Sequence, residues 1–445
     1  MGRDEDADAG PADEAARQGI DIEAESPETG TDPAVAIALS GGGSRAIAFH
    51  LGCLRALERC GILERAQTLS TVSGGSVIGA LYSARSGSFD LFEADVRRLL
   101  SEGLVAPSAK ALFKRDLWGA IALTSGLAAS NAARLLAHKA RAVVSRRARD
   151  ETPEARADPL IPRARSRTTA LARALDSRWF KAKTIDQLSA RRPRLVINAC
   201  ELTEGSAFYF TREESGSWRL GRLADNSILL ADAVTASAAY PAALPALDRT
   251  FVFVDKRGER QVRRVSLTDG GVYDNTALAP LWPERDPQIS LAVPTPDIVI
   301  ACRAGYGLQP AGVAHFWRSR MQRVVGVALA RAENASIQRL FLTQRAGGFK
   351  SVALAYLGQN DARLAFPPED PVARDSVFDY PTDFSAMNDD MIDKLVRRGE
   401  QLTLAMLREH VPFLLRSGNV PLRADGGSDR PTLSSSSDEP LSCTS

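Results

Sequence analysis

Two strand–turn–helix units follow one another near the start of this chain, and they constrain its fold more than any other feature. Residues 35–39 are an uninterrupted apolar run that ends at a glycine loop, and residues 46–60 then carry apolar side chains at helical spacing. A second unit has a strand over 69–72, a glycine turn, and a helix over 77–82. Short, wholly apolar strands are typical of parallel sheets covered on both faces. The pattern therefore predicts an α/β sheet whose strands are joined by right-handed crossovers.

The later part of the chain continues this α/β character after an interruption. Residues 100–192 are rich in Ala, Leu and Arg, and we expect them to form a helical, basic insert. Beyond the insert, helical stretches are predicted over 313–331 and 389–415. The predicted strands of this part cover residues 195–199, 207–210, 251–254, 262–266 and 298–301.

The charge and the cysteine content exclude several classes of function. With 56 basic and 54 acidic residues the formal net charge is +2, so no global field attracts nucleic acid. The five cysteines are an odd set without a Cys-x-x-Cys pair, which argues against a disulfide framework and against a zinc site. We expect them to be small, buried apolar residues.

Both ends of the chain have the composition of disordered tails. Residues 1–34 are strongly acidic and contain no apolar run, which also argues against a secretory signal peptide. The expected location is therefore cytoplasmic. Residues 419–445 are rich in Ser, Asp, Gly and Pro.

Ser73 lies at the second glycine turn, between a predicted strand and a predicted helix, and is the candidate nucleophile. A serine at a tight strand-to-helix turn exposes its hydroxyl, and the N-terminus of the following helix favours negative charge nearby. Gly74 and Gly75 let the turn pass close to both elements. The alternative is a turn in which Ser73 or Ser76 merely caps the helix. The motif alone leaves both interpretations open.

The first glycine turn, residues 41–45, can bind an anion in two ways. Successive glycines allow backbone amides to converge on an oxyanion, helped by the dipole of the following helix. Gly41, Gly43 and Ala46 also satisfy a Gly-x-Gly-x-x-Ala dinucleotide-binding pattern after a strand. A P-loop is excluded because no Lys-Ser/Thr pair follows the glycines. The loop by itself does not decide between an oxyanion hole and a dinucleotide site.

Asp269 is the candidate base for Ser73. It follows an apolar strand and begins an Asp-Gly-Gly turn, although Asp-Gly is also a common turn dipeptide without catalytic meaning. A carboxylate can replace histidine as the base if partial desolvation raises its pKa toward the working range. The three histidines downstream of Ser73 lack an acidic partner in a recognisable turn; they are His138, His315 and His410.

Together, these three motifs in this order resemble the patatin-like phospholipases. The resemblance implies a three-layer α/β/α fold, a Ser–Asp dyad without histidine, and no metal or organic cofactor. It decides against the dinucleotide site, because three spaced motifs are more specific than one. The residues that carry the resemblance are 41–45, 72–75 and 269–271, with further likeness at 49–54, 196–202, 236–241 and 380–399.

The resemblance also assigns roles to individual residues. Ser73 is implied to be the nucleophile and Asp269 its base. Thr71 and Ala46 stand where the family has glycine, and Arg45 is expected to brace the loop rather than to touch substrate. The implied oxyanion and substrate-binding residues are Gly41, Gly42, Gly43, Ser44, Arg45 and Gly74, supported by Gly75, Gly270 and Gly271.

The expected function is that of a lipid acyl hydrolase of the phospholipase A or lysophospholipase type, working through an acyl-enzyme. The catalytic domain would span residues 35–282 and carry the insert, and a helical or α/β extension over 283–418 would pack on it. Two alternatives are kept. One is a nonlipid carboxylesterase on the same site, and the other is a noncatalytic lipid or nucleotide sensor that retains the fold.

The stretch from Leu117 to Arg149 is a candidate membrane contact. Its first part, residues 117–133, is uncharged but too short and too interrupted by polar residues for a transmembrane helix. Six basic residues follow, and this combination is typical of an interfacial element on anionic lipid. A helical cap over the active site with solvated arginines explains the same pattern.

Overall fold

A computed structural model describes residues 33–415 except 105–165, 191–192, 242, 286–290, 292, 308–311, 314 and 379. The strands are β1 (Val35–Leu39), β2 (Thr68–Val72), β3 (Arg194–Glu201), β4 (Ser206–Phe210), β5 (Ser215–Ser217), β6 (Gly221–Leu223), β7 (Leu247–Val254), β8 (Arg260–Asp269), β9 (Ile298–Arg303) and β10 (Ser351–Tyr356). The helices are α2 (Gly43–Arg59), α3 (Ile62–Arg65), α4 (Gly74–Ala84), α5 (Phe89–Glu102), α8 (Arg167–Leu175), α9 (Leu230–Ser237), α10 (Gly271–Asp274), α11 (Trp317–Arg345), α12 (Asp389–His410) and α13 (Pro412–Leu415).

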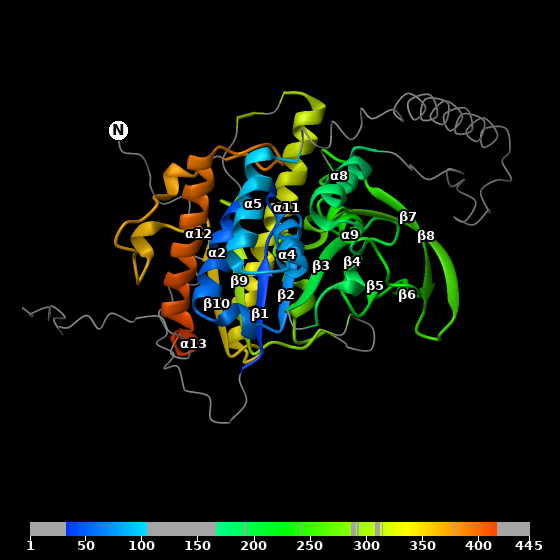
Figure 1. The fold of residues 1–445 in the computed structure, drawn as a ribbon, viewed down its shortest axis with the longest axis horizontal. Helices are drawn as coiled ribbons and strands as arrows, with labels where there is room; N and C mark the ends of the chain where they lie inside the picture. The colour runs from blue at the N-terminus through cyan, green and yellow to red at the C-terminus, as the bar shows by residue number, and fades with distance from the viewer. Residues whose placement is uncertain are drawn as a thin grey trace, which may run out of the picture.

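The ten strands form one mixed sheet in the order β10-β9-β1-β2-β3-β4-β5-β6-β7-β8 (Figure 1). From β10 to β3 all neighbours are parallel, and from β3 to β8 all are antiparallel. β8 returns to pair with β3 as well. The predicted parallel α/β sheet is therefore confirmed for the half that begins the chain, and the other half is an antiparallel extension of it.

The residues of β1 alternate between two apolar cores, one on each face of the sheet. Ile37 and Leu39 lie in the core shared with α2, α4 and α12. Ala36 and Ala38 lie in a second core with Ile337 of α11. Successive side chains of a strand point to opposite faces, so a wholly apolar strand requires helices on both sides. Figure 1 shows α2, α4 and α5 on one side of the sheet and α11 on the other, which confirms the three-layer architecture.

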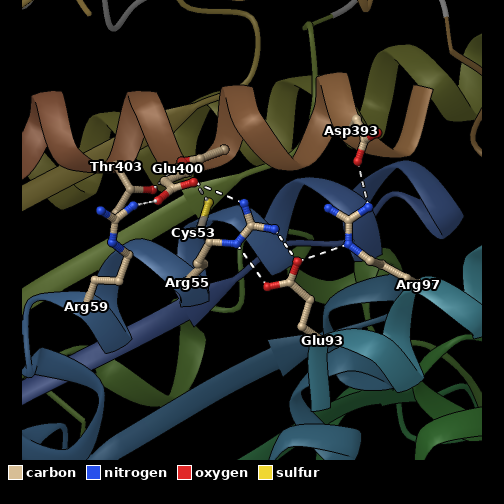
Figure 2. Close-up of polar contacts among 9 residues, drawn as sticks. Cys53, Arg55, Arg59, Glu93, Arg97, Asp393, Glu400 and Thr403 are labelled. Atoms are coloured by element: carbon tan, nitrogen blue, oxygen red, sulfur yellow. Dashed lines mark hydrogen bonds and ion pairs between the residues drawn. The ribbon is translucent and has the colours of Figure 1, made fainter. Parts of the chain in front are cut away.

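Glycines and ion pairs together fix α12 against α2. A Cβ at Gly52 would lie 1.8 Å from the Val396 carbonyl oxygen, and one at Gly399 would lie 2.1 Å from the Phe49 carbonyl oxygen. The two helices therefore cross where each lacks a side chain. Figure 2 shows the polar rim of this contact, in which Arg55 binds both Glu93 of α5 and Glu400 of α12, Arg59 also binds Glu400, and Arg97 joins Glu93 to Asp393.

Most predicted elements are present, with shifted ends. The predicted helix over 313–331 is observed as α11, Trp317–Arg345, and the helix predicted over 389–415 is divided into α12 and α13. The part beyond residue 282 does more than cover the domain, because β9 and β10 form one edge of the central sheet. β10, the short β5 and β6, and α5 were not predicted.

Several predictions concern residues that the structure does not describe. The stretch from Leu117 to Arg149 and nearly all of both predicted tails lie outside the described residues. Of the predicted insert, residues 100–104 and 166–190 are described, and they include the end of α5 and all of α8. Within the described helices, none is long and apolar enough to cross a bilayer. Cys53, Cys60, Cys200 and Cys302 are free and buried, as predicted for them.

Candidate active site

The strand register places Ser73 beside Asp269. β2 runs parallel to β3 and ends with Val72 opposite Asn198. β8 runs antiparallel to β3 and ends with Asp269 opposite Ala199, the next residue of β3. The ends of β2 and β8 therefore meet head to head along one edge of β3. Residues distant in sequence are brought together by two backbone pairings to one strand.

Ser73 has the strained backbone of a sharp strand-to-helix turn, with φ 53° and ψ −119°. Both following glycines are required by close approach of other backbone. A Cβ at Gly74 would lie 2.4 Å from the Gly43 carbonyl oxygen, and one at Gly75 would lie 2.4 Å from the Leu39 carbonyl oxygen. A positive φ at serine is unfavourable and is maintained only where the surroundings determine it. The turn thus packs the start of α4 directly against the first glycine loop.

A direct hydrogen bond joins the two predicted catalytic side chains. The Ser73 hydroxyl donates to Asp269 Oδ2 at 2.8 Å. Asp269 Oδ1 accepts from the Gly271 amide at 2.7 Å, which fixes the carboxylate plane. Asp269 is only 4% exposed, and burial raises its pKa from 3.8 to about 6, although the Gly271 amide and the Ser73 hydroxyl oppose this shift. The carboxylate is thus a stronger base than an exposed aspartate and is ionised at neutral pH.

Histidine takes no part in this hydrogen bonding among the described residues. The buried His50 ring contacts the Ser40 carbonyl oxygen at 2.9 Å through Nε2. His410 lies at the end of α12 beside Glu409, and His315 is exposed before α11. His138 lies outside the described residues. The geometry is that of a serine–carboxylate pair.

Two amides of the first glycine loop are already bound to other backbone. The Gly41 amide donates to the Asn275 carbonyl oxygen at 3.1 Å, and the Ser44 amide donates to the Asp383 carbonyl oxygen at 2.6 Å. Asp383 lies close above the loop, since a Cβ at Gly43 would be 2.2 Å from its carbonyl oxygen. The predicted contribution of the Ser44 amide to an oxyanion hole is therefore unavailable in this arrangement.

The amides of Gly42, Gly43 and Gly74 are differently placed. None of the three has a hydrogen-bond acceptor among the described residues. Gly42 and Gly43 have φ values of 140° and 60°, which glycine adopts without strain. All three amides lie at the N-termini of α2 and α4, where unpaired N–H groups and the helix dipoles favour an anion. They are the donors that remain for a developing negative charge.

Arg45 binds two backbone carbonyls from the C-terminal part of the chain. Its Nε donates to the Ala304 carbonyl oxygen at 2.9 Å, and its Nη1 donates to the Tyr380 carbonyl oxygen at 2.9 Å. The guanidinium also lies over the Tyr306 ring, 5.1 Å from its centroid. These contacts are those of a side chain that holds the glycine loop in place.

Ser237 was not predicted as a site residue, yet it hydrogen-bonds to Ser73 and to Gly270, the residue that follows Asp269. Its hydroxyl accepts from the Ser73 amide at 3.0 Å and donates to the Asn198 carbonyl oxygen at 2.6 Å. Its own carbonyl oxygen accepts from the Gly270 amide at 3.1 Å. Ser76 lies 2.8 Å from the same hydroxyl. The only sequence signal was the position of Ser237 inside the block 236–241, which carries part of the resemblance.

The two departures from the family pattern are accommodated by neighbouring residues. The Thr71 hydroxyl donates to the Val196 carbonyl oxygen at 3.0 Å and accepts from Ser76 at 3.1 Å. Its methyl group occupies space that Gly79 leaves open, since a Cβ at Gly79 would lie 2.6 Å from it. The Ala46 methyl fits because its neighbour Gly42 has no side chain.

The described residues form no metal site, because no group of three His, Cys, Asp or Glu side chains among them is arranged to hold an ion.

The comparison with family models gives a definite match. The model described as patatin-like phospholipase covers residues 37–282, more than half of the chain. The chain belongs to the patatin-like phospholipase family.

Several solved structures resemble this patatin-like protein at low identity. Human GIVD cytosolic phospholipase A2 matches with 12% identity and a TM-score of 0.47, over 88% of this chain and 64% of that chain. The same human protein with methyl gamma-linolenyl fluorophosphonate and terbium chloride matches with 14% identity and a TM-score of 0.47, over 87% and 59%. VipD from Legionella pneumophila matches with 12% identity and a TM-score of 0.34, over 88% and 68%. The chain thus spans less than two thirds of the human structures' length, and no curated protein matches it.

Proposed function

We propose that this patatin-like protein hydrolyses carboxylic ester bonds of phospholipids or lysophospholipids through a Ser73–Asp269 dyad. The proposal rests on one observation, the 2.8 Å hydrogen bond from the Ser73 hydroxyl to the buried Asp269 carboxylate. A serine hydroxyl becomes a competent nucleophile only when a base can take its proton as the new bond forms. Here the base contacts the nucleophile directly.

In the acylation step, the Ser73 oxygen attacks the ester carbonyl carbon while its proton moves to Asp269. The carbonyl oxygen acquires a negative charge, which the amides of Gly42, Gly43 and Gly74 stabilise. In acyl transfer, one preorganised amide donor typically lowers the activation free energy by roughly 3 to 4 kcal/mol. The tetrahedral intermediate then collapses, and the leaving alcohol takes the proton from Asp269.

The acyl-enzyme on Ser73 is then hydrolysed by water. Asp269 is again ionised and takes a proton from a water molecule, whose oxygen attacks the acyl carbonyl carbon. The same three amides stabilise the second oxyanion. Release of the carboxylic acid returns the proton to the Ser73 oxygen and regenerates the hydrogen bond to Asp269.

Labelling with a fluorophosphonate probe tests the dyad, because only an activated serine reacts covalently. We expect the probe to label the intact protein on Ser73, and we expect no label on Ser73→Ala. Ser101→Ala, a change at an exposed serine on α5, is the matched control and should label normally. Labelling that persists at full extent in Ser73→Ala would contradict the proposal.

Substrate profiling then separates the candidate activities. The proposal requires hydrolysis of phospholipid or lysophospholipid with release of fatty acid, and loss of that release in Ser73→Ala. Hydrolysis confined to short water-soluble esters would instead identify a nonlipid carboxylesterase. A protein that neither labels nor hydrolyses any ester would be a noncatalytic sensor.

A further inference from the structure

Asn275 places its side-chain amide between the two segments that carry Ser73 and Asp269. The residue follows α10, and its backbone carbonyl oxygen accepts from the Gly41 amide at 3.1 Å. A Cβ at Gly41 would lie 2.2 Å from Asn275 Oδ1 and 3.2 Å from the Ser73 Cβ. The Asn275 amide oxygen therefore occupies the space that a side chain at Gly41 would need, and it does so beside the nucleophile.

The same oxygen lies close to the carboxylate of Asp269. A Cβ at Gly271 would lie 2.7 Å from Asn275 Oδ1 and 3.0 Å from Asp269 Oδ1. Two oxygens that both lie this close to one point can be bridged by a single water molecule through hydrogen bonds of ordinary length. A water molecule that binds the carboxylate on this side can therefore bind Asn275 at the same time.

The Asn275 side-chain amide has no hydrogen-bond partner within the described part of the chain. The side chain is half-buried, so water reaches it. The neighbouring Ser237 hydroxyl is by contrast engaged, because it binds the Ser73 amide and the Asn198 carbonyl oxygen. The backbone bond to Gly41 holds Asn275 in place while its amide keeps an unpaired donor and an unpaired acceptor. It is preorganised to bind a polar group in the site.

Hydrolysis of the acyl-enzyme requires a group of this kind, whereas its formation does not. The attacking water carries two protons, and Asp269 takes one of them. The other stays on the water oxygen and becomes the acid proton of the product. An acceptor for this second proton orients the water, so that a lone pair points at the acyl carbonyl carbon. The Asn275 amide oxygen suits this task, because it accepts a hydrogen bond without taking the proton.

We propose that Asn275 positions the hydrolytic water for deacylation. The water donates one hydrogen bond to Asp269 and the other to Asn275 Oδ1. As the water oxygen bonds to the acyl carbon, one proton moves to Asp269. The tetrahedral intermediate then breaks its bond to the Ser73 oxygen, which takes that proton, and the second proton leaves with the carboxylic acid. This inference rests on the proposed dyad and adds the residue that orients its second nucleophile.

Competition between water and methanol for the acyl-enzyme tests this role. Methanol has one hydroxyl proton, which Asp269 takes, and no second proton for Asn275 to bind. Asn275→Leu keeps the approximate size of the side chain and removes both polar atoms. With a soluble short-chain ester, we expect the ratio of methyl ester to free acid to rise by about fivefold or more, the factor that one lost hydrogen bond gives. Because both products arise from one acyl-enzyme, this ratio does not depend on the fraction of folded protein.

Two further variants serve as controls for the product ratio. Asn275→Asp retains an acceptor at the same place, so above the pKa of both carboxyls it should keep the ratio within about twofold of that of the intact protein. Asn360→Ala removes an amide that caps the turn after β10, at the edge strand of the sheet, and should leave the ratio unchanged. The burst of alcohol release, which measures acylation, should change by less than about threefold in Asn275→Leu, and the acyl-enzyme should accumulate in its intact mass spectrum.

An unchanged product ratio in Asn275→Leu would overturn the proposal. An acylation burst slowed as much as the steady-state rate would also overturn it, because that result identifies an oxyanion donor, whose loss affects both steps. Failure of the proposed dyad is recognised separately. Intact protein that takes no fluorophosphonate label and forms no acyl-enzyme on Ser73 would overturn the dyad and the role of Asn275 together.

Discussion

The burial of Asp269 has two opposing effects, since it raises the basicity of the carboxylate, as the proposed dyad needs, and also makes the negative charge costly. In the unfolded chain the carboxyl titrates near 3.8, and in the folded protein its pKa is about 6. Between these values the folded state holds a proton that the unfolded state has lost. The contribution of Asp269 to the free energy of unfolding therefore falls as the pH rises through this window.

The variant Asp269→Asn should accordingly be more stable and less active. An asparagine can still accept from Gly271 and donate to the Ser73 oxygen, but it carries no charge and cannot take a proton. Above pH 6 we expect the free energy of unfolding to rise by up to about 3 kcal/mol, the equivalent of the pKa shift. The rate should fall by at least about 10²-fold. Urea unfolding at pH 7 and at pH 4 measures the effect, which should vanish at the lower pH.

The pH dependence of activity should follow the same carboxyl. Because Asp269 must be ionised to accept the Ser73 proton, kcat/KM for a soluble ester should rise through pH about 6 and then level off. A rising limb centred near pH 4 would mean that Asp269 is not desolvated when the enzyme works. A bell centred on a histidine pKa would indicate a different base.

Ser237 should act as a positioning residue for the nucleophile. Ser237→Ala leaves the Ser73 amide without its acceptor and frees a turn held at positive φ. Loss of such a buried bond costs about 1 to 3 kcal/mol, so kcat for a soluble ester should fall roughly tenfold or more with little change in KM. Ser83→Ala is the matched control, because Ser83 is buried on α4 and its hydroxyl has no hydrogen-bond partner among the described residues. Equal kcat in the two variants would deny Ser237 this role.

At the scale of elements, the crossing of α2 and α12 depends on two missing side chains. Gly399→Ala would place a methyl group 2.1 Å from the Phe49 carbonyl oxygen, and rigid backbone cannot yield easily. We expect destabilisation of about 1 to 3 kcal/mol, as for other overpacked contacts. Gly312→Ala, which meets no atom within 4 Å, should leave the melting temperature unchanged. Thermal unfolding of the two variants provides the comparison.

The sequence predicted the local elements of the fold better than the contacts between distant elements. The strand and helix around Ser73 are local patterns of apolar spacing and glycine turns, and they were predicted. The return of β8 to β3, which brings Asp269 to Ser73, is a backbone pairing between distant segments. The bond from the Ser44 amide to Asp383 and those of Ser237 are likewise long-range and use backbone groups that every residue carries. Such contacts leave no local periodicity in the sequence. The pairing of Asp269 with Ser73 was predicted only through the family resemblance, and the bonds of the Ser44 amide and of Ser237 were not predicted.

At the scale of the whole molecule, the candidate active site is assembled from distant parts of the described chain. The glycine loop and Ser73 come from its beginning, Asp269 from its middle, and the backbone that holds Ser44 and Arg45 from residues 380–383 near its end. The predicted C-terminal extension therefore takes part in shaping the site. Arg45 joins the glycine loop to this part of the chain through its bonds to the Ala304 and Tyr380 carbonyl oxygens.

The position of β9 means that the matched family segment is not a self-sufficient folding unit. β9 lies against β1 along its whole length, so a chain cut after residue 282 would leave β1 as a bare sheet edge. An uncovered, wholly apolar edge pairs readily with other chains. Such a fragment should form aggregates that bind thioflavin T, whereas a chain ending at residue 415 should stay monodisperse. The boundary at which sequence similarity fades and the boundary at which the polypeptide can be divided are separate properties of this protein.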